Sequence, residues 1–258
     1  MISHDASVVL LHASASSARQ WQSLADALAP RFRVHAIDLH GHGERTPWSR
    51  VRPLTLADDA ALAAPVFSSA TDVHLVGHSY GGAVALKLAA TYPRQVRSVM
   101  LYEPVMFRWL ADAGVAEIAD VTALVDAIRE RLAAELPHDA AQVFIDYWSG
   151  RGAWLAMSTS RKQAIAVRMP SILSHFDALF SEPLALRQAA RLSMPMMLMT
   201  GERTVRAMHK LAQLARSGLP AAKHSTLAQA GHMGPITCAG TFNREVLAFL
   251  EREVRMAA

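Results

Sequence analysis

One stretch, residues 71–90 (TDVHLVGHSYGGAVALKLAA), constrains the fold more than any other part of the chain. The apolar run at 73–76 predicts a short buried strand, and the pattern turns helical directly after Ser79. A serine between a strand end and a helix start needs a tight turn with very small neighbours, which Gly77 and Gly81 supply. We predict that this turn presents Ser79 as a nucleophile beside helical N–H groups that favour negative charge. The alternative is that the glycines only let the helix pack closely on the strand.

The length and composition predict a globular α/β protein. The 258 residues (28.0 kDa) fit one large domain or a core with an insertion. The hydrophobic content of 52% and the charged content of 19% are ordinary for such a protein. No run of about 18 apolar residues predicts a membrane span. The first residues lack a basic segment before their apolar run, so we expect no secretory signal.

Cysteine usage and charge restrict the location and the partners. A single cysteine, Cys238, excludes an internal disulfide and fits a cytoplasmic location. The net charge is +4, but the arginines are scattered rather than banded, so we expect no nucleic-acid partner. The expected partner is a small-molecule substrate. The sequence leaves monomer and homodimer open.

Strands and helices alternate along most of the chain, which predicts a parallel sheet with right-handed crossovers. Residues 105–190 interrupt this alternation with a mostly helical pattern, which predicts a cap over the sheet edge. We therefore assign residues 1–104 and 191–258 to an α/β core. The strands are expected near 7–11, 32–38, 73–76, 96–102, 195–200 and 223–227.

Polar residues stand where several of these strands end. They include His12, Asp38, Ser79 and Glu103, and the carboxyl ends of parallel strands are where ligands meet such sheets. A serine becomes a good nucleophile when an imidazole takes its proton and a carboxylate orients that imidazole. The sequence therefore predicts a reaction centre at this edge.

Four segments together carry a family likeness. They are His12 at the end of the first strand, DLHGHG at 38–43, GHSYGG at 77–82 and AGHMGP at 230–235. In this order they resemble the α/β-hydrolase fold superfamily over nearly the full length. The resemblance implies a mostly parallel sheet flanked by helices, with a helical cap inserted after the strand that follows the serine strand. Because few residues precede the first strand, we expect the opening hairpin to be missing, and six strands in the order 2-1-3-4-5-6.

The resemblance also implies roles for the site residues. Ser79 matches the nucleophile, and His232, in the loop after the last strand, matches the base. Most relatives place the acid at the position that Thr204 occupies here, and threonine cannot carry a negative charge. We expect Glu103 to be the acid, because some haloalkane dehalogenases and similar hydrolases place theirs after the strand that follows the nucleophile strand. Glu202, another carboxylate, or a dyad without an acid remain the alternatives.

The backbone N–H of Tyr80 and a second N–H from the loop after the first strand are expected to form the oxyanion hole. Relatives usually have a glycine where this chain has Ala13 and Ser14. We prefer Ala13 as the second donor, with the N–H of Ser14 as the next choice. The hydroxyl of Ser14 or Ser16 either reaches the site or hydrogen-bonds within its own loop.

An apolar substrate pocket is expected beneath the cap. Aromatic residues and methionines at helical spacing belong either to such a pocket or to the core of the cap. We assign to the pocket His12, Met106, Trp109, Tyr147, Trp148 and Trp154.

These observations predict a serine hydrolase, in the first place a carboxylesterase that acts through an acyl-enzyme on a modest-sized, largely apolar ester. No metal or organic cofactor is expected. The same residues also serve carbon–carbon, lactone or thioester hydrolysis, so the bond remains open. Thr204 and the altered glycine loop leave a second class open, a binding protein that keeps the fold without turnover.

Overall fold

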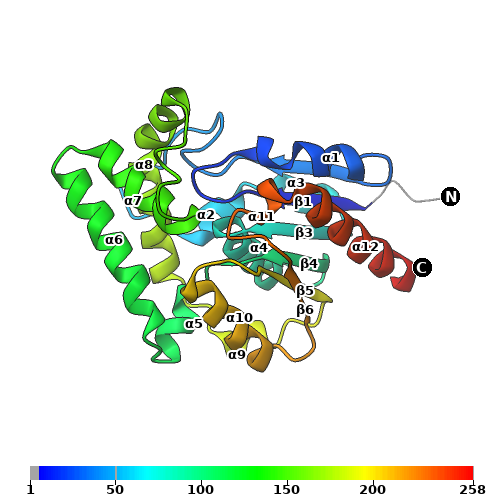
Figure 1. The fold of residues 1–258 in the computed structure, drawn as a ribbon. Helices are drawn as coiled ribbons and strands as arrows, with labels where there is room; N and C mark the ends of the chain where they lie inside the picture. The colour runs from blue at the N-terminus through cyan, green and yellow to red at the C-terminus, as the bar shows by residue number, and fades with distance from the viewer. Residues whose placement is uncertain (1–5, 50, 258) are drawn as a thin grey trace.

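Six parallel strands form the central sheet of the computed structural model, which describes residues 6–49 and 51–257 (Figure 1). The strands pair in the order β2-β1-β3-β4-β5-β6, and each neighbouring pair is parallel, which confirms the expected sheet. The expected lack of an opening hairpin concerns chain before β1, where residues 1–5 lie outside the described part. The strands are β1 (Ser7–Leu11), β2 (Arg33–Ile37), β3 (Val73–His78), β4 (Val96–Tyr102), β5 (Met196–Gly201) and β6 (Lys223–Leu227).

Burial along the strands follows their place in the sheet. All residues of β1 and β3 are buried, because helices cover both faces of the centre and favour continuous apolar runs there. The edge strands β2 and β6 are partly exposed and more polar. The centre of the sheet is therefore the rigid support on which the strand ends present their side chains.

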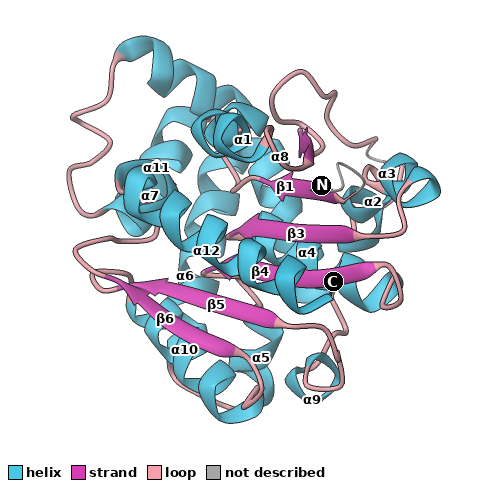
Figure 2. Ribbon diagram, turned by 90° about the vertical axis from the view of Figure 1, so that its right-hand side faces the viewer, coloured by secondary structure: helices cyan, strands magenta, loops and turns pink. Residues whose placement is uncertain are grey.

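Helices cover the two faces of the sheet (Figure 2). On one face, a 3₁₀ turn η1 (Ala18–Trp21), α1 (Gln22–Leu28) and α12 (Ala239–Ala257) pack over one apolar cluster of the strands. A larger cluster joins the other face to four further helices. Those helices are α2 (Leu56–Ala61), α3 (Ala64–Ser69), α4 (Tyr80–Thr91) and α10 (Arg206–Gly218).

Of the helices between β4 and β5, the first four lie beyond the carboxyl ends of the strands, at the left of Figure 1. They are α5 (Phe107–Asp112), α6 (Glu117–Ala133), α7 (Pro137–Ser149) and α8 (Thr159–Ser181). Their buried side chains share the larger apolar cluster with the sheet. The division into a core and a cap over 105–190 stays a prediction, in line with where β4 ends and β5 begins.

Two short helices complete the chain, α9 (Leu186–Ala189) before β5 and α11 (Gly234–Thr237) before α12. No helix within 6–49 and 51–257 is both long enough and apolar enough to cross a membrane.

Candidate active site

The turn at Ser79 has the sharp geometry that its flanking glycines predict. β3 ends at residue 78, α4 begins at residue 80, and Ser79 between them has φ 56° and ψ −119°. A Cβ atom on Gly81 would lie 2.3 Å from the carbonyl oxygen of Leu11, and one on Gly77 would lie 2.5 Å from the carbonyl oxygen of Gly81. No side chain fits at either glycine, so the turn requires both.

A chain of two hydrogen bonds links three side chains from distant parts of the sequence. Nε2 of His232 lies 2.9 Å from Oγ of Ser79, and Nδ1 of His232 lies 2.6 Å from Oε2 of Glu103. All three residues are buried, with exposures of 3% to 6%. Glu103 follows β4 with φ 45°, so two of the three residues adopt a backbone conformation that side chains rarely take. The structure thus brings together the three residues predicted from the sequence.

Glu103 receives two further donors that fix its carboxylate. The N–H of Gly201 donates to Oε1 at 2.7 Å, and the hydroxyl of Thr204 donates to Oε2 at 2.7 Å. Thr204 therefore supports the carboxylate from the position where most relatives would place their acid. Glu202 is exposed and accepts a hydrogen bond from the N–H of Gln229, so its carboxylate is engaged away from the imidazole.

The loop after β1 lies beside the serine. The N–H of Ala13, which we preferred as the second oxyanion donor, already donates to Oε1 of Gln20 at 3.2 Å, and this favours Ser14, our second choice. The N–H of Ser14 has no protein acceptor among the described residues. The N–H of Tyr80 is the first of α4, where helical N–H groups have no partner in their own helix.

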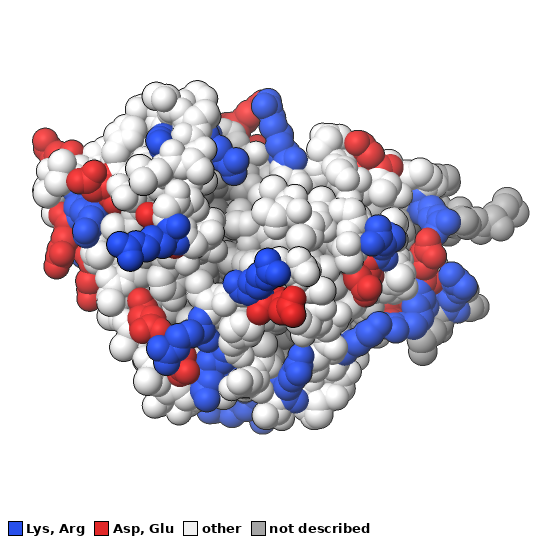
Figure 3. Space-filling model, in the orientation of Figure 1, with Lys and Arg blue, Asp and Glu red and all other residues white. Residues whose placement is uncertain are grey.

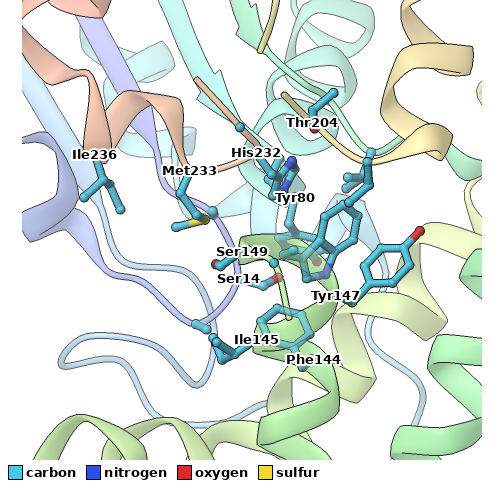
Figure 4. A pocket seen from close by; sticks show the side chains of 18 of the residues that line it. Ser14, Tyr80, Phe144, Ile145, Tyr147, Ser149, Thr204, His232, Met233 and Ile236 are labelled. Atoms are coloured by element: carbon cyan, nitrogen blue, oxygen red, sulfur yellow. Dashed lines mark hydrogen bonds between the residues drawn. The ribbon is translucent and has the colours of Figure 1, made fainter. Parts of the chain in front are cut away.

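A cavity of about 450 Å³ opens between these residues and the cap (Figure 4). Tyr147 and Trp148, both predicted, line it from α7. Figure 4 shows the Tyr147 hydroxyl directed away from the other labelled side chains, and burial raises the pKa of this phenol to about 12. Most of the remaining lining is apolar and was not predicted. It includes Val105, Phe107, Phe144, Ile145, Ile165, Leu179, Val205, Met233 and Ile236.

Four residues predicted for the pocket are absent from the lining of this cavity and have structural roles instead. His12 is buried, accepts the N–H of Leu39 on Nε2 and donates from Nδ1 to the carbonyl of residue 13. Trp109 donates its indole N–H to the carbonyl of residue 184. Met106 and Trp154 are buried in the apolar cluster that joins the cap to the sheet. Helical spacing alone could not separate the cap core from the cavity wall.

Helix α7 contacts the imidazole directly. The ring of Trp148 stacks on the ring of His232 with centroids 4.2 Å apart and planes inclined by 30°. On the core side, His78 donates from Nε2 to the main-chain carbonyl of His232 at 2.8 Å. Burial, followed by the nearby His232, lowers the pKa of His78 well below its ordinary value, so His78 is a neutral support.

Charged side chains surround the site without forming a field of one sign. Figure 3 shows basic and acidic side chains interspersed over one face of the molecule, including a basic and an acidic one near its middle. Several of them are paired along helices, as Arg108 is with Asp112 and Arg129 with Asp126. The expectation of no nucleic-acid partner stays a prediction.

The sheet has this strand order, the serine lies on a strand-to-helix elbow, and the histidine follows the last strand. Together these features define the α/β-hydrolase class. The comparisons with known proteins agree. Residues 8–245 match the model of the alpha/beta hydrolase family. The chain belongs to this family.

Individual relatives are more distant. The chain is 27% identical over 251 residues to the dihydrolipoyllysine-residue acetyltransferase component of the acetoin cleaving system of Pseudomonas putida, covering 95% of this chain and 63% of that protein. It is 38% identical over 117 residues to the lipase LipV of Mycobacterium tuberculosis, and the match covers 45% of this chain and 42% of that protein. These matches thus span less than two thirds of either relative. Among solved structures, the chain superposes with a TM-score of 0.78 on MGS-M2, an α/β hydrolase enzyme from a deep-sea metagenome library. The two are 15% identical, and the match covers 97% of this chain and 90% of that one.

Proposed function

We propose that this protein is a serine carboxylesterase that hydrolyses a modest-sized, largely apolar ester through an acyl-enzyme. The observation that carries the proposal is the continuous chain of hydrogen bonds from Ser79 through His232 to Glu103. In it, a hydroxyl meets an imidazole whose other nitrogen meets a buried carboxylate. This arrangement is what nucleophilic acyl transfer requires.

The first half of the reaction follows from this geometry. Oγ of Ser79 attacks the ester carbonyl while Nε2 of His232 takes the serine proton, and Glu103 stabilises the imidazolium that forms. The negative oxygen of the tetrahedral intermediate accepts hydrogen bonds from the N–H groups of Tyr80 and Ser14. When the carbon–oxygen bond breaks, His232 gives its proton to the leaving alcohol.

The second half repeats these steps with water. His232 takes a proton from the water as its oxygen attacks the acyl-enzyme carbonyl, and then returns that proton to Oγ of Ser79 as the acid leaves. Trp148 supports both halves, because an aromatic face attracts a cation and its ring lies on the imidazole that becomes charged. Apolar side chains make up most of the cavity lining and favour an apolar substrate part, while Arg161 and Arg203 also line the cavity.

The names of relatives support ester chemistry. One is a lipase, and a relative in Yersinia enterocolitica, 32% identical over 96 residues, is a pimeloyl-[acyl-carrier protein] methyl ester esterase. Hydrolysis of a carbon–carbon bond, a lactone or a thioester uses the same three residues. If the ester screen is negative, these three reactions are the ones to test next. A binding protein would not need the hydrogen bonds to Ser79, and this favours the enzyme. The absence of a cofactor, the small-molecule partner and the cytoplasmic location stay predictions.

The test is a screen of p-nitrophenyl esters of graded acyl length, with the purified protein and its Ser79→Ala variant. We expect turnover that reaches a maximum at the acyl length that fills the cavity, and a loss of about 10⁵ or more without the serine hydroxyl. Equal turnover by the two proteins would refute the proposal. Glu202→Gln is the matched control, since its exposed carboxylate is engaged elsewhere, and it should keep normal turnover.

A further inference from the structure

A second group of polar side chains, buried except for the partly exposed Ser14, lies at the oxyanion loop. Oγ of Ser14 lies 2.8 Å from Nδ1 of His175, which α8 of the cap supplies. Nε2 of His175 lies 3.8 Å from Oδ2 of Asp59, on α2. Ser14 and His175 both line the cavity, whose wall is otherwise largely apolar. This group therefore adds a hydroxyl and an imidazole to a wall whose other polar members include Arg161, Arg203 and Thr237.

The Asp59 side chain carries the charge of this group. It has no exposed surface, and it accepts three hydrogen bonds. They come from the backbone N–H of His40 at 2.9 Å, from Nδ1 of the same residue at 2.7 Å and from the hydroxyl of Tyr80 at 2.7 Å. Burial raises the pKa of Asp59, but these donors and the nearby His175 outweigh it, so the net pKa is lowered. Asp59 is a buried carboxylate anion.

The surroundings of His175 fix the position of its ring proton. Within residues 6–49 and 51–257 its Nε2 has no hydrogen-bond partner, and Oδ2 of Asp59 lies 3.8 Å from it. A carboxylate can only accept, so Nε2 carries the hydrogen and Nδ1 is bare. The Ser14 hydroxyl must then donate its proton to Nδ1.

Stacking holds the ring in this orientation. One face of His175 lies 3.7 Å from the ring of Tyr80 with planes 2° apart, and His42 stacks at 4.6 Å with planes 20° apart. Burial lowers the pKa of His175 to about 4, so the ring is neutral at pH 7. Such a weak base holds the proton of Ser14 in a hydrogen bond without removing it, and Ser14 is therefore no second nucleophile.

We propose that Oγ of Ser14 is a fixed hydrogen-bond acceptor that recognises a hydroxyl group on the substrate. Its proton is committed to His175, so only its lone pairs remain for a ligand in the cavity. A substrate hydroxyl fits this acceptor, whereas an ether or carbonyl oxygen would face it without a hydrogen. The inference deepens the proposed esterase function and rests on it for the substrate class, a hydroxy-substituted ester.

The test compares ethyl 2- and 3-hydroxybutyrate with their methoxy counterparts and with ethyl butyrate. In the wild-type protein we expect kcat/KM for a hydroxy ester at one of the two positions to exceed that of its methoxy ether about tenfold. Ser14→Ala should bring this ratio to within about threefold of one. His175→Phe should also lower it, because the freed Ser14 hydroxyl can then donate to the ether. Ser16→Ala changes a hydroxyl of the same loop that lies in a different hollow, and it should leave the ratio unchanged.

Binding to the Ser79→Ala variant, measured by calorimetry, gives the same comparison without turnover. We expect its Kd for the favoured hydroxy ester to be about tenfold below that for the methoxy ether, with the difference lost when Ser14→Ala is added. Ratios near one at both positions, or a ratio that survives Ser14→Ala, would overturn the inference. Failure to hydrolyse every ester of this set and of the p-nitrophenyl series would refute the esterase instead, and the Kd comparison would still decide the role of Ser14.

Discussion

Replacing Glu103 by glutamine tests which carboxylate serves His232. The change keeps the size of the side chain and removes its charge. Glu103 and His232 are 2.6 Å apart at their nearest atoms, so the charges of a carboxylate and an imidazolium would be centred about 4 Å apart. At an effective dielectric constant of about 20, their attraction is about 4 kcal/mol.

That energy corresponds to about three factors of ten in rate. An amide N–H next to Nδ1 also favours the tautomer with a proton on Nε2, which cannot accept the proton of Ser79. We therefore expect Glu103→Gln to lower kcat by about 10³ to 10⁴. Stopped-flow release of p-nitrophenol from the preferred ester gives kcat, and circular dichroism confirms that the variant is folded.

A second substitution makes the argument sharper. The hydroxyl of Thr204 lies 2.7 Å from the Glu103 carboxylate, so an aspartate at 204 could put a carboxylate beside His232. We expect Glu103→Gln combined with Thr204→Asp to recover at least about tenfold over Glu103→Gln alone. Thr204→Asp by itself should lower activity, because two carboxylates in contact repel each other. Near-normal activity of Glu103→Gln, or a larger loss in Glu202→Gln, would refute the assignment of the acid.

Two further results are expected. Trp148→Leu removes the aromatic face from His232 and should lower kcat/KM about 2- to 30-fold, while Trp148→Phe keeps most of the activity; equal kinetics for the two variants would contradict the stacking role. Acid should destabilise the fold. Burial lowers the pKa of His74 and His175 in the folded protein to about 4, whereas the same side chains in the unfolded chain bind protons below about pH 6.5. Above pH 6.5, each histidine contributes about 3 kcal/mol to the free energy of unfolding. This contribution is lost progressively as the pH falls from about 6.5 to about 4. Urea unfolding measured between pH 7.5 and 4.5 checks this; a constant free energy would contradict it, and His74→Gln should reduce the loss.

The sheet and the three central residues were predictable because their physical requirements appear in local sequence. A serine between glycines, after an apolar run and before a helical one, permits few backbone conformations. Parallel strands then bring their carboxyl ends to one edge, which places Glu103 beside Ser79. Thr204 was read as a missing acid, and only its distance to Glu103 shows that it supports the acid from the next strand.

The cap was harder to read, because its helices bury apolar side chains both against each other and toward the cavity. Trp109 and Trp154 serve the cap interior, whereas Trp148 reaches the imidazole. The same limit hid Asp59 and His175. They are far apart in the chain and belong to no motif, and only the packing of α8 against the oxyanion loop brings them together.

The central claim is that His232 and Glu103 make the Ser79 hydroxyl nucleophilic, and labelling with a fluorophosphonate tests it most directly. Intact-mass and peptide mass spectrometry of the treated protein should show a single adduct, located on Ser79. The adduct should be lost in Ser79→Ala and after denaturation, and it should form much more slowly in Glu103→Gln. An unmodified native protein, or an adduct on Ser14 in place of Ser79, would contradict the account.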